Sequence, residues 1–359
     1  MKLLVITQKV DKNDSNLGFF HMWLEKLAKQ VEQLYVICLG KGEYDLPVNV
    51  DVVSLGKEKG SASTLRYALR FYACLWKLRG KYDNVFVHMN PEYVILGGLF
   101  WRFTGKKVLL WYTHKAVNLR LLLAEKFATK IFTASKESFR LPTKKVTVVG
   151  HGIPVEFFAE QRWEPGYGRS GNPPSTIFPM TAGRISPAKD LKTFFSAIAE
   201  LGKESTSPIF CFGVYGRPIT KDDIEYKKKI EDFAVQLGLK LSINDIGNSY
   251  NEMPMIYQAH HFLIHTSRTG SLDKVVLEAL ASGRIVVTSS GAYADAVKEG
   301  VVYTFSEGNY QELANTIEKI CKAGILAPDR LPNQKAIEYV KKHHNLDNLI
   351  AKIIDYFTL

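Results

Sequence analysis

A polar loop that opens a short apolar helix is the part of this sequence with the clearest chemical potential. Residues 266–273 of the loop read ThrSerArgThrGlySerLeuAsp, and the helix that follows carries a single acid, Glu278. Backbone N–H groups and the dipole at the start of a helix favour an anion such as a phosphate. A carboxylate further into the helix is better suited to accept hydrogen bonds from hydroxyls, as an acid does on a nucleotide ribose. The stretch therefore predicts a site for a nucleotide, or for a nucleotide joined to a sugar.

A second loop with two cations points to the same kind of ligand. Residues 181–191 read ThrAlaGlyArgIleSerProAlaLysAspLeu, with a predicted strand that ends at Gly183 and a helix after Pro187. Arg184 and Lys189 are five positions apart across this loop, so both can face one anion. Arginine offers two parallel donors and lysine a point charge, which together suit a diphosphate.

The stretch around Glu278 resembles the sugar-nucleotide signature of the retaining glycosyltransferases of family four, the glycosyl transferases group 1, which have two lobes and the GT-B fold. The family pattern is an acid, seven residues and a second acid, followed by Ala, a small residue and Gly. Glu278 and the tail AlaLeuAlaSerGly match the second acid, whereas Gly270 occupies the position of the first, with Asp273 as the nearest replacement. Arg184 and Lys189 match the family's Gly-Arg followed by Lys.

The resemblance implies a role for each of these residues. Arg184, Lys189 and the backbone N–H groups near residues 274–276 would stabilise the negative charge that grows on the leaving phosphate. Glu278 would bind the ribose, and Asp273 would contact the sugar; as a structural alternative, Asp273 caps the helix that follows. The other predicted donor contacts are Gly18, Ser271, Leu272, Lys274, Val275 and Asn248.

Polar side chains also follow two neighbouring strands predicted in the first half. His88 and Asn90 end one strand, and Thr113 and His114 end the next. Ligands of parallel sheets bind at the carboxyl ends of the strands, so both pairs are expected to face a cleft. By the resemblance, His114 lies near the transferred sugar and is predicted to be catalytic, and we predict His88 and Asn90 as acceptor contacts. The alternative for either histidine is a structural role, without contact to a substrate.

The elements that must position these residues alternate between short apolar runs and helical patterns, which indicates parallel sheets covered by helices. In the first half, we predict strands at residues 3–6, 34–39, 50–53, 85–88, 108–112, 130–133 and 146–149. In the second half, we predict them at residues 178–182, 209–214, 239–243, 262–265, 285–288 and 302–305. This pattern predicts an α/β fold of two doubly wound, Rossmann-like lobes that face a central cleft.

The length of 359 residues favours two domains. We predict an N-terminal acceptor-binding lobe over residues 1–157 and a C-terminal nucleotide-sugar-binding lobe over residues 177–344. Residues 158–176, with Pro, Gly and Ser and little periodicity, read as a linker. By the resemblance, the last helix, at 345–359, packs back on the first lobe.

The net charge of +11 is concentrated in the first half of the chain. Residues 1–160 hold 24 Lys and Arg against 14 Asp and Glu, whereas residues 161–359 hold 23 against 22. Such a field attracts an anionic membrane, a nucleic acid or an acidic substrate, or it serves solubility alone.

The helix predicted over residues 63–81 adds to the case for a membrane. It carries one basic stripe and one apolar, partly aromatic stripe, which suits a helix at an anionic membrane surface. The alternative is a core helix with a solvated basic edge. Only the net charge supports a nucleic-acid partner, and we therefore expect none.

The composition, with 46% hydrophobic and 23% charged residues, is typical of soluble globular proteins. No apolar run approaches the roughly 18 residues of a membrane span, and the N-terminus reads as a first strand rather than a signal peptide. The four widely spaced cysteines predict reduced thiols. We therefore expect a cytoplasmic protein, either free or peripheral on the inner face of the cytoplasmic membrane.

The function that these patterns and the resemblance imply is a retaining glycosyltransferase, with a nucleotide-diphosphate sugar as donor and a polysaccharide or lipid-linked acceptor. No Asp-x-Asp triplet occurs, so we expect no metal and no other cofactor. Two alternatives stay open: a non-catalytic binding or scaffold protein with a degraded cleft, and a sugar-nucleotide epimerase on the same fold. No Gly-x-Gly-x-x-Gly follows the first strand, which argues against an enzyme that binds a dinucleotide.

Overall fold

The chain forms two compact units, each described here by itself. The computed structural model describes residues 1–60, 62–159, 176–203, 209–210, 212–240, 243–244, 249–325 and 332–359. Unit 1 comprises Met1–Gly152, Ser249–Asn251 and His344–Leu359, and unit 2 comprises Ile153–Asn248 and Glu252–His343.

Unit 1 is built on a seven-stranded parallel sheet with the strand order β3-β2-β1-β4-β5-β6-β7. Its strands are β1 (Lys2–Val10), β2 (Gln33–Lys41), β3 (Val50–Ser54), β4 (Asn84–His88), β5 (Val108–Trp111), β6 (Lys130–Thr133) and β7 (Val146–Val148). Central strands such as β1 and β4 each contain a continuous apolar run, at 3–6 and 85–87, because helices cover the sheet on both faces.

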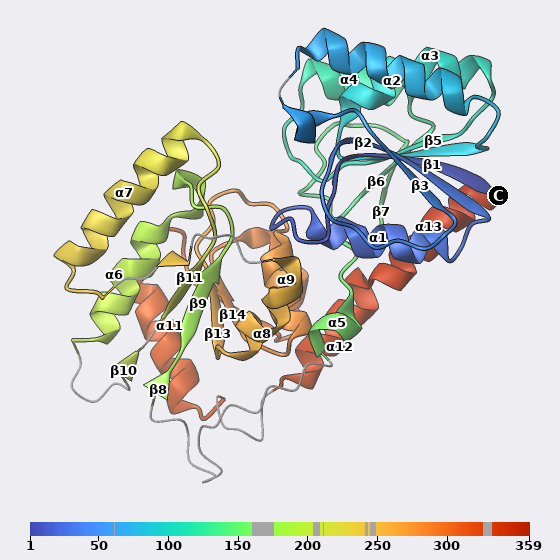
Figure 1. Cartoon of the computed structure of the whole chain (residues 1–359). Helices are drawn as coiled ribbons and strands as arrows, with labels where there is room; N and C mark the ends of the chain where they lie inside the picture. The colour runs from blue at the N-terminus through green and yellow to red at the C-terminus, as the bar shows by residue number, and fades with distance from the viewer. Residues whose placement is uncertain are drawn as a thin grey trace. The chain divides into compact units, whose positions relative to one another are not determined.

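The helices of unit 1 form two layers (Figure 1). On one face of the sheet lie α1 (Gly18–Ala28) and α13 (Leu346–Thr358), and on the other lie α2 (Thr64–Leu78), α3 (Pro91–Phe103) and α4 (Leu119–Phe127). The sheet and its helices enclose an apolar core.

The last helix, α13, belongs to unit 1 although the chain reaches it from unit 2. Asn345 caps its first turn by accepting hydrogen bonds from the backbone N–H groups of Asp347 and Asn348. The helix then contacts α1, where Lys26 and Asp347 form an ion pair at 2.5 Å.

Unit 2 contains a six-stranded parallel sheet with the order β12-β11-β9-β13-β14-β15. Its strands are β9 (Pro179–Ala182), β11 (Gly213–Tyr215), β12 (Ile243–Asn244), β13 (Phe262–His265), β14 (Ile285–Thr288) and β15 (Val302–Thr304). The α-helices assigned along this part of the chain are α5 (Val155–Ala159), α6 (Leu191–Leu201), α7 (Lys221–Gln236), α8 (Met253–Gln258), α9 (Lys274–Ala281), α10 (Ala294–Lys298), α11 (Tyr310–Lys322) and α12 (Gln334–His344).

Two strands predicted in the second half differ from the structure by more than one residue. The predicted run 209–214 is divided into β10 (Ile209–Phe210), which pairs with β8 (Thr176–Ile177), and β11, which pairs with β9. Both pairs keep the same register but belong to separate sheets, and they are separated beside Pro179, whose nitrogen cannot donate a hydrogen bond.

The second difference lies after α7, where a strand over 239–243 was expected. Leu239 instead donates its backbone N–H to the carbonyl of Ala234 and so belongs to the turn that ends the helix. Gly238, with a φ of +75°, makes that turn possible. The described part of β12 is Ile243–Asn244, and residues 241–242 of the predicted strand lie outside the described part of the chain.

The boundary between the units falls between Gly152 and Ile153, a few residues before the predicted lobe end at 157. The short helix α5 that follows packs on α8 and α9, and Gln258 of α8 donates to the carbonyl of Phe158 at 3.2 Å. These contacts tie α5 to unit 2. Of the predicted linker, residues 160–175 lie outside the described part of the chain.

Both main sheets share one winding pattern. In each, the second and third strands lie on one side of the first strand, and the fourth lies on the other side. The order therefore reverses between β1 and β4 in unit 1, and between β9 and β13 in unit 2. Ligands of open α/β sheets bind at such reversals, beyond the carboxyl ends of the strands. In the described parts of the chain, no helix is long and apolar enough to cross a membrane.

Candidate functional site

Two loops of unit 2 are joined by an ion pair where the strand order reverses. The loop after β9 carries Lys189, and the loop after β13 ends at Asp273. The Lys189 ammonium contacts the Asp273 carboxylate, and both side chains are largely buried. A Cβ added to Gly183 would lie 3.4 Å from Lys189 Cε, so the lysine chain passes directly over this glycine.

The Asp273 carboxylate is the centre of a small polar cluster. Its Oδ2 lies 2.9 Å from Nε2 of His265, and its Oδ1 accepts a hydrogen bond from Ser271 at 3.0 Å. Burial raises the pKa of Asp273, but the hydrogen bond from His265 and the charge of Lys189 outweigh burial and hold the pKa well below its usual range. The carboxylate is therefore ionised at neutral pH.

His265, at the end of β13, connects this cluster to the next strand. Burial lowers the pKa of its imidazole in spite of Asp273, so the ring is neutral at pH 7. Nε2 then donates to the Asp273 carboxylate, and Nδ1 accepts from the hydroxyl of Thr288 at 2.8 Å. Sequence reasoning missed His265 and Thr288. The available signal was their position at the carboxyl ends of two adjacent strands.

The helix-cap alternative for Asp273 does not describe its side chain. Asp273 is the N-cap residue of α9, but the carboxylate makes no hydrogen bond to the first turn of the helix. It points instead to the lysine and the histidine. The backbone N–H of Asp273 is held by Tyr293, whose hydroxyl lies 2.7 Å away.

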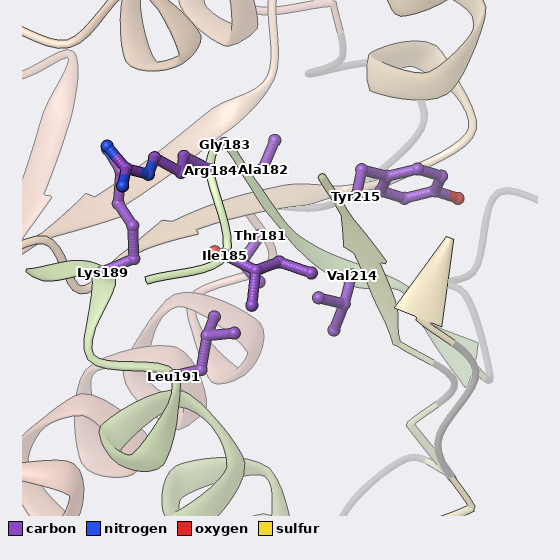
Figure 2. A pocket seen from close by; sticks show the side chains of 9 residues that line it. All are labelled: Thr181, Ala182, Gly183, Arg184, Ile185, Lys189, Leu191, Val214 and Tyr215. Carbon is purple, nitrogen blue, oxygen red and sulfur yellow. The ribbon is translucent and has the colours of Figure 1, made fainter. Parts of the chain in front are cut away.

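Arg184 lines the same pocket as Lys189 but pairs with a different acid. The pocket lies at the carboxyl ends of β9 and β11, with Arg184 and Lys189 on one side and Tyr215 on the other (Figure 2). Arg184 donates through Nε to Asp223 at 2.7 Å and forms an ion pair with it through a terminal nitrogen. The two predicted cations thus line one pocket, each beside its own carboxylate.

Asp223 also completes the start of α7. It forms a reciprocal capping box with Thr220, which satisfies backbone N–H groups at the helix start. Burial raises the pKa of Asp223, but the hydrogen bonds from Arg184 and the backbone lower it to about 2. Sequence reasoning did not identify Asp223.

Glu278 lies inside α9 and is only 4% exposed. Its Oε2 accepts a hydrogen bond from the hydroxyl of Tyr257 at 2.9 Å, a contact that was not expected from the sequence. Lys274, which starts α9, lies one turn before Glu278, and burial lowers its pKa against the charge of Glu278. Leu272 is buried and Val275 is half-buried. If these two residues contact the donor as predicted, they do so through backbone atoms.

In unit 1, the structure places His88 in the core rather than on an open surface. The ring is 1% exposed, stacks on Phe20 with centroids 4.0 Å apart, and lies 3.2 Å from Thr7 Oγ1. Aromatic rings thus cover the His88 side chain, and its contact with an acceptor stays a prediction. Asn90 is half-buried, and its Oδ1 accepts from Gln8 at 2.6 Å.

The remaining predicted residues are spread over the loops. His114 is exposed, and its Nδ1 accepts from the backbone N–H of Ala116 at 3.1 Å. A Cβ on Gly18 would lie 3.0 Å from the carbonyl oxygen of Lys12 and 2.9 Å from Tyr250 Cβ, so close packing alone explains this glycine. Asn248 lies outside the described residues.

Comparisons with known proteins identify the family of part of the chain and the fold of the whole. The family model described as "Glycosyl transferases group 1" matches residues 169–343, which include the pocket, the Asp273 cluster and Glu278. A search of the curated proteins finds no match.

Solved structures similar to the whole chain were found as well. HepE of Anabaena, in complex with UDP, is 17% identical with a TM-score of 0.75, and the match covers 100% of both chains. The sucrose-phosphate synthase of Thermosynechococcus elongatus is 13% identical with a TM-score of 0.74, covering 100% of this chain and 98% of that one. WaaG, a glycosyltransferase involved in lipopolysaccharide biosynthesis, is 14% identical with a TM-score of 0.71 and full coverage of both chains.

At these identities the structural matches establish the fold, and the family model establishes the family of the matched residues. Residues 169–343 form a group 1 glycosyltransferase domain, the chain has the GT-B fold, and the protein is a glycosyltransferase.

Proposed function

We propose that the protein transfers a sugar from a nucleotide-diphosphate sugar to an acceptor hydroxyl, with retention of the anomeric configuration and without a divalent metal. The observation that carries this proposal is the pairing of Lys189 with Asp273 where the strand order of unit 2 reverses, beside a pocket lined by Arg184. HepE, which shares the fold, was solved with UDP and with UDP-glucose. UDP-sugars are therefore the first donors to test.

The reaction breaks the bond between the anomeric carbon and the diphosphate oxygen. The bonding electrons go to that oxygen, and the acceptor hydroxyl attacks on the same face of the sugar. The leaving phosphate takes the acceptor proton, so no side-chain nucleophile is required. Arg184 and Lys189 stabilise the growing negative charge, which is the usual role of fixed cations and N–H donors.

Asp273 acts in this proposal by positioning Lys189. An isolated lysine side chain has many rotamers, and ordering it costs free energy. The carboxylate and the neutral His265 fix the ammonium over Gly183 before the donor arrives. When the donor binds, Lys189 keeps its contact with Asp273, and the diphosphate becomes a second anion beside the ammonium. Such preorganisation is what makes electrostatic stabilisation effective.

Glu278 accepts the ribose hydroxyls in this proposal, and Tyr257 orients its carboxylate. One oxygen, Oε2, is occupied by the Tyr257 hydroxyl. A carboxylate has several lone-pair sites, so one acid can accept hydrogen bonds from more than one donor. The acceptor is a carbohydrate or a lipid-linked sugar, bound by unit 1 near Asn90 and the catalytic histidine His114.

Thermal unfolding with UDP, GDP, ADP, dTDP and CDP tests the donor site. A ligand at about 100 times its Kd stabilises the folded protein by roughly 2.7 kcal/mol. We expect one nucleotide to raise the Tm of the wild type and of Lys228→Ala, a change of an exposed lysine on α7. The shift should be lost in Glu278→Gln and reduced in Lys189→Ala. Equal shifts in all four proteins would disprove the site.

Retention and metal independence are tested on the transfer reaction itself. Proton NMR of the product, taken early, reports the anomeric configuration, and we expect it to equal that of the donor. Transfer should continue in EDTA. Inversion, or a complete loss that Mn²⁺ restores, would refute the corresponding part of the proposal.

A further inference from the structure

The helix α2 of unit 1 exposes an apolar stripe that its own core does not use. Phe71, Leu75 and Leu78 are buried and cover the sheet. A second stripe, with spacings of four, three and four residues, points to solvent and consists of Leu65, Leu69, Tyr72 and Trp76. The Trp76 side chain is 64% exposed. The core of unit 1 is filled without this stripe, so the stripe can contact an apolar surface outside the unit.

The two helices beside α2 continue the apolar surface. Phe103 on α3 is 86% exposed, and Leu99 lies one turn before it. On α4, Leu119 is 70% exposed and shares its side of the helix with Leu122 and Leu123. Of the eighteen large apolar side chains exposed in the described residues, nine belong to these three helices. Isolated exposed apolar residues need no explanation, but a gathered set marks an interaction surface.

All three helices cover the same face of the seven-stranded sheet (Figure 1). Tyr72 of α2 donates to the carbonyl of Leu96 on α3 at 3.0 Å, and Arg120 of α4 pairs with Glu92 of α3 at 2.7 Å. These contacts hold the exposed stripes side by side. We call the solvent side of α2, α3 and α4 the outer helical face.

The charge of the outer helical face is positive. The three helices contain six Lys and Arg residues against two acids, Glu92 and Glu125. Both acids are already in ion pairs, with Arg120 and Lys145. The Arg79 guanidinium, just after α2, lies 4.2 Å from the centre of the Trp76 ring. The exposed apolar side chains thus share these helices with a surplus of cations, and Arg79 lies against one of them.

We propose that the outer helical face docks on an anionic lipid bilayer. Apolar side chains enter the boundary between headgroups and acyl chains, while Lys and Arg pair with the anionic headgroups. Tryptophan and tyrosine, both present on α2, are the residues that favour this boundary. Such docking keeps unit 1, the predicted acceptor-binding lobe, on the membrane surface. The inference rests on this surface alone and stands apart from the donor chemistry of unit 2.

Co-sedimentation with vesicles tests the proposal. We expect the wild type to bind vesicles of phosphatidylcholine with phosphatidylglycerol at least about tenfold more strongly than phosphatidylcholine alone. Trp76→Ser combined with Phe103→Ser should weaken that binding about tenfold or more, since each change removes an exposed apolar side chain that would enter the bilayer. Arg66→Glu combined with Lys77→Glu should weaken it at least as much. The matched control is Ile224→Ser with Val235→Ser, two exposed residues of α7 in unit 2, and should bind as the wild type does.

Three results would overturn the proposal. One is equal binding to neutral and anionic vesicles, and another is unchanged binding by the outer-face variants. The third is a wild-type dimer that Trp76→Ser with Phe103→Ser converts to a monomer without any vesicle binding, which would assign the face to a second copy of the chain. The Tm of each variant shows that it is folded, and its nucleotide-induced Tm shift keeps this test separate from that of the donor site.

Discussion

Asp273 could serve a glycosyltransferase in either of two ways, by binding the sugar or by positioning a cation. Its contacts with Lys189 and His265 favour the second. We expect Asp273→Asn to weaken the binding of a nucleoside diphosphate and of the matching sugar nucleotide by the same factor, and to slow transfer by up to about 100-fold through misplacement of Lys189. Isothermal titration with both ligands measures this. Weaker binding of the sugar nucleotide alone would show that Asp273 binds the sugar.

His261, directly before β13, makes the stability of unit 2 depend on pH. Its Nδ1 accepts the backbone N–H of Phe178 at 3.1 Å. Burial and the charge of Arg284 lower the pKa of His261 to about 4, against an ordinary value of 6.5. The unfolded chain then binds more protons, so this contribution to stability is complete above pH 6.5 and is lost as the pH falls toward 4.

We therefore expect the Tm of the wild type to fall more steeply between pH 6.5 and pH 4 than that of His261→Gln, which cannot take up the proton. Differential scanning calorimetry across this range gives both curves. Parallel curves would mean that His261 keeps its ordinary pKa in the folded protein.

Glu278, Asp273 and Lys189 could be selected as candidates from the sequence, because each lies at a recognisable spacing within its own loop or helix. His265 and Tyr257 could not be predicted, because their partners lie on other elements and the contacts depend on how those elements pack. His88 was placed at a strand end correctly, but its burial by Phe20 comes from a helix that the strand pattern does not describe.

At the scale of elements, the close approach of two loops at the pocket depends on one glycine. A Cβ on Gly216 would lie 1.8 Å from the carbonyl oxygen of Gly183, and Gly216 has a φ of +151°. Gly238, also at positive φ, has no heavy atom within 4 Å of such a Cβ. Backbone strain acts at both positions, but the clash acts at only one.

Gly216→Ala should therefore lower the free energy of unfolding by about 1–3 kcal/mol more than Gly238→Ala does. It should also remove the nucleotide-induced Tm shift, because the Gly183 loop carries Arg184. Urea denaturation of the two variants measures the difference. Equal losses of stability would show that the loops can move apart without cost.

The strands were the most predictable elements because buried parallel strands are apolar along their whole length. β13 and β14 match their predicted ranges, and β3 extends one residue past its predicted end. The failures occurred where a local hydrogen bond decides the structure, at Pro179 in the ladder and at Leu239 in the turn after α7. Apolar patterning carries no information about such bonds.

At the scale of the whole molecule, the winding of both sheets followed from the alternation of strands and helices, and the resemblance supplied the pairing of two such lobes. The first half has 24 basic against 14 acidic residues, and α2, α3 and α4 contribute six of the basic and two of the acidic ones. What the structure adds is that exposed apolar side chains are concentrated on the outer helical face of these helices. The sequence alone could not separate this stripe from the buried stripe of α2, because both are apolar at helical spacing.

The central claim is that Lys189 and its partners form the donor site of a sugar-nucleotide transferase. The most direct measurement is the release of nucleoside diphosphate from a panel of sugar nucleotides, beginning with UDP-glucose, in EDTA. We predict that one donor is consumed by the wild type and by Lys228→Ala, and that Lys189→Ala is slower by about 100-fold or more. Consumption of no donor, or an equal rate in Lys189→Ala, would contradict the claim.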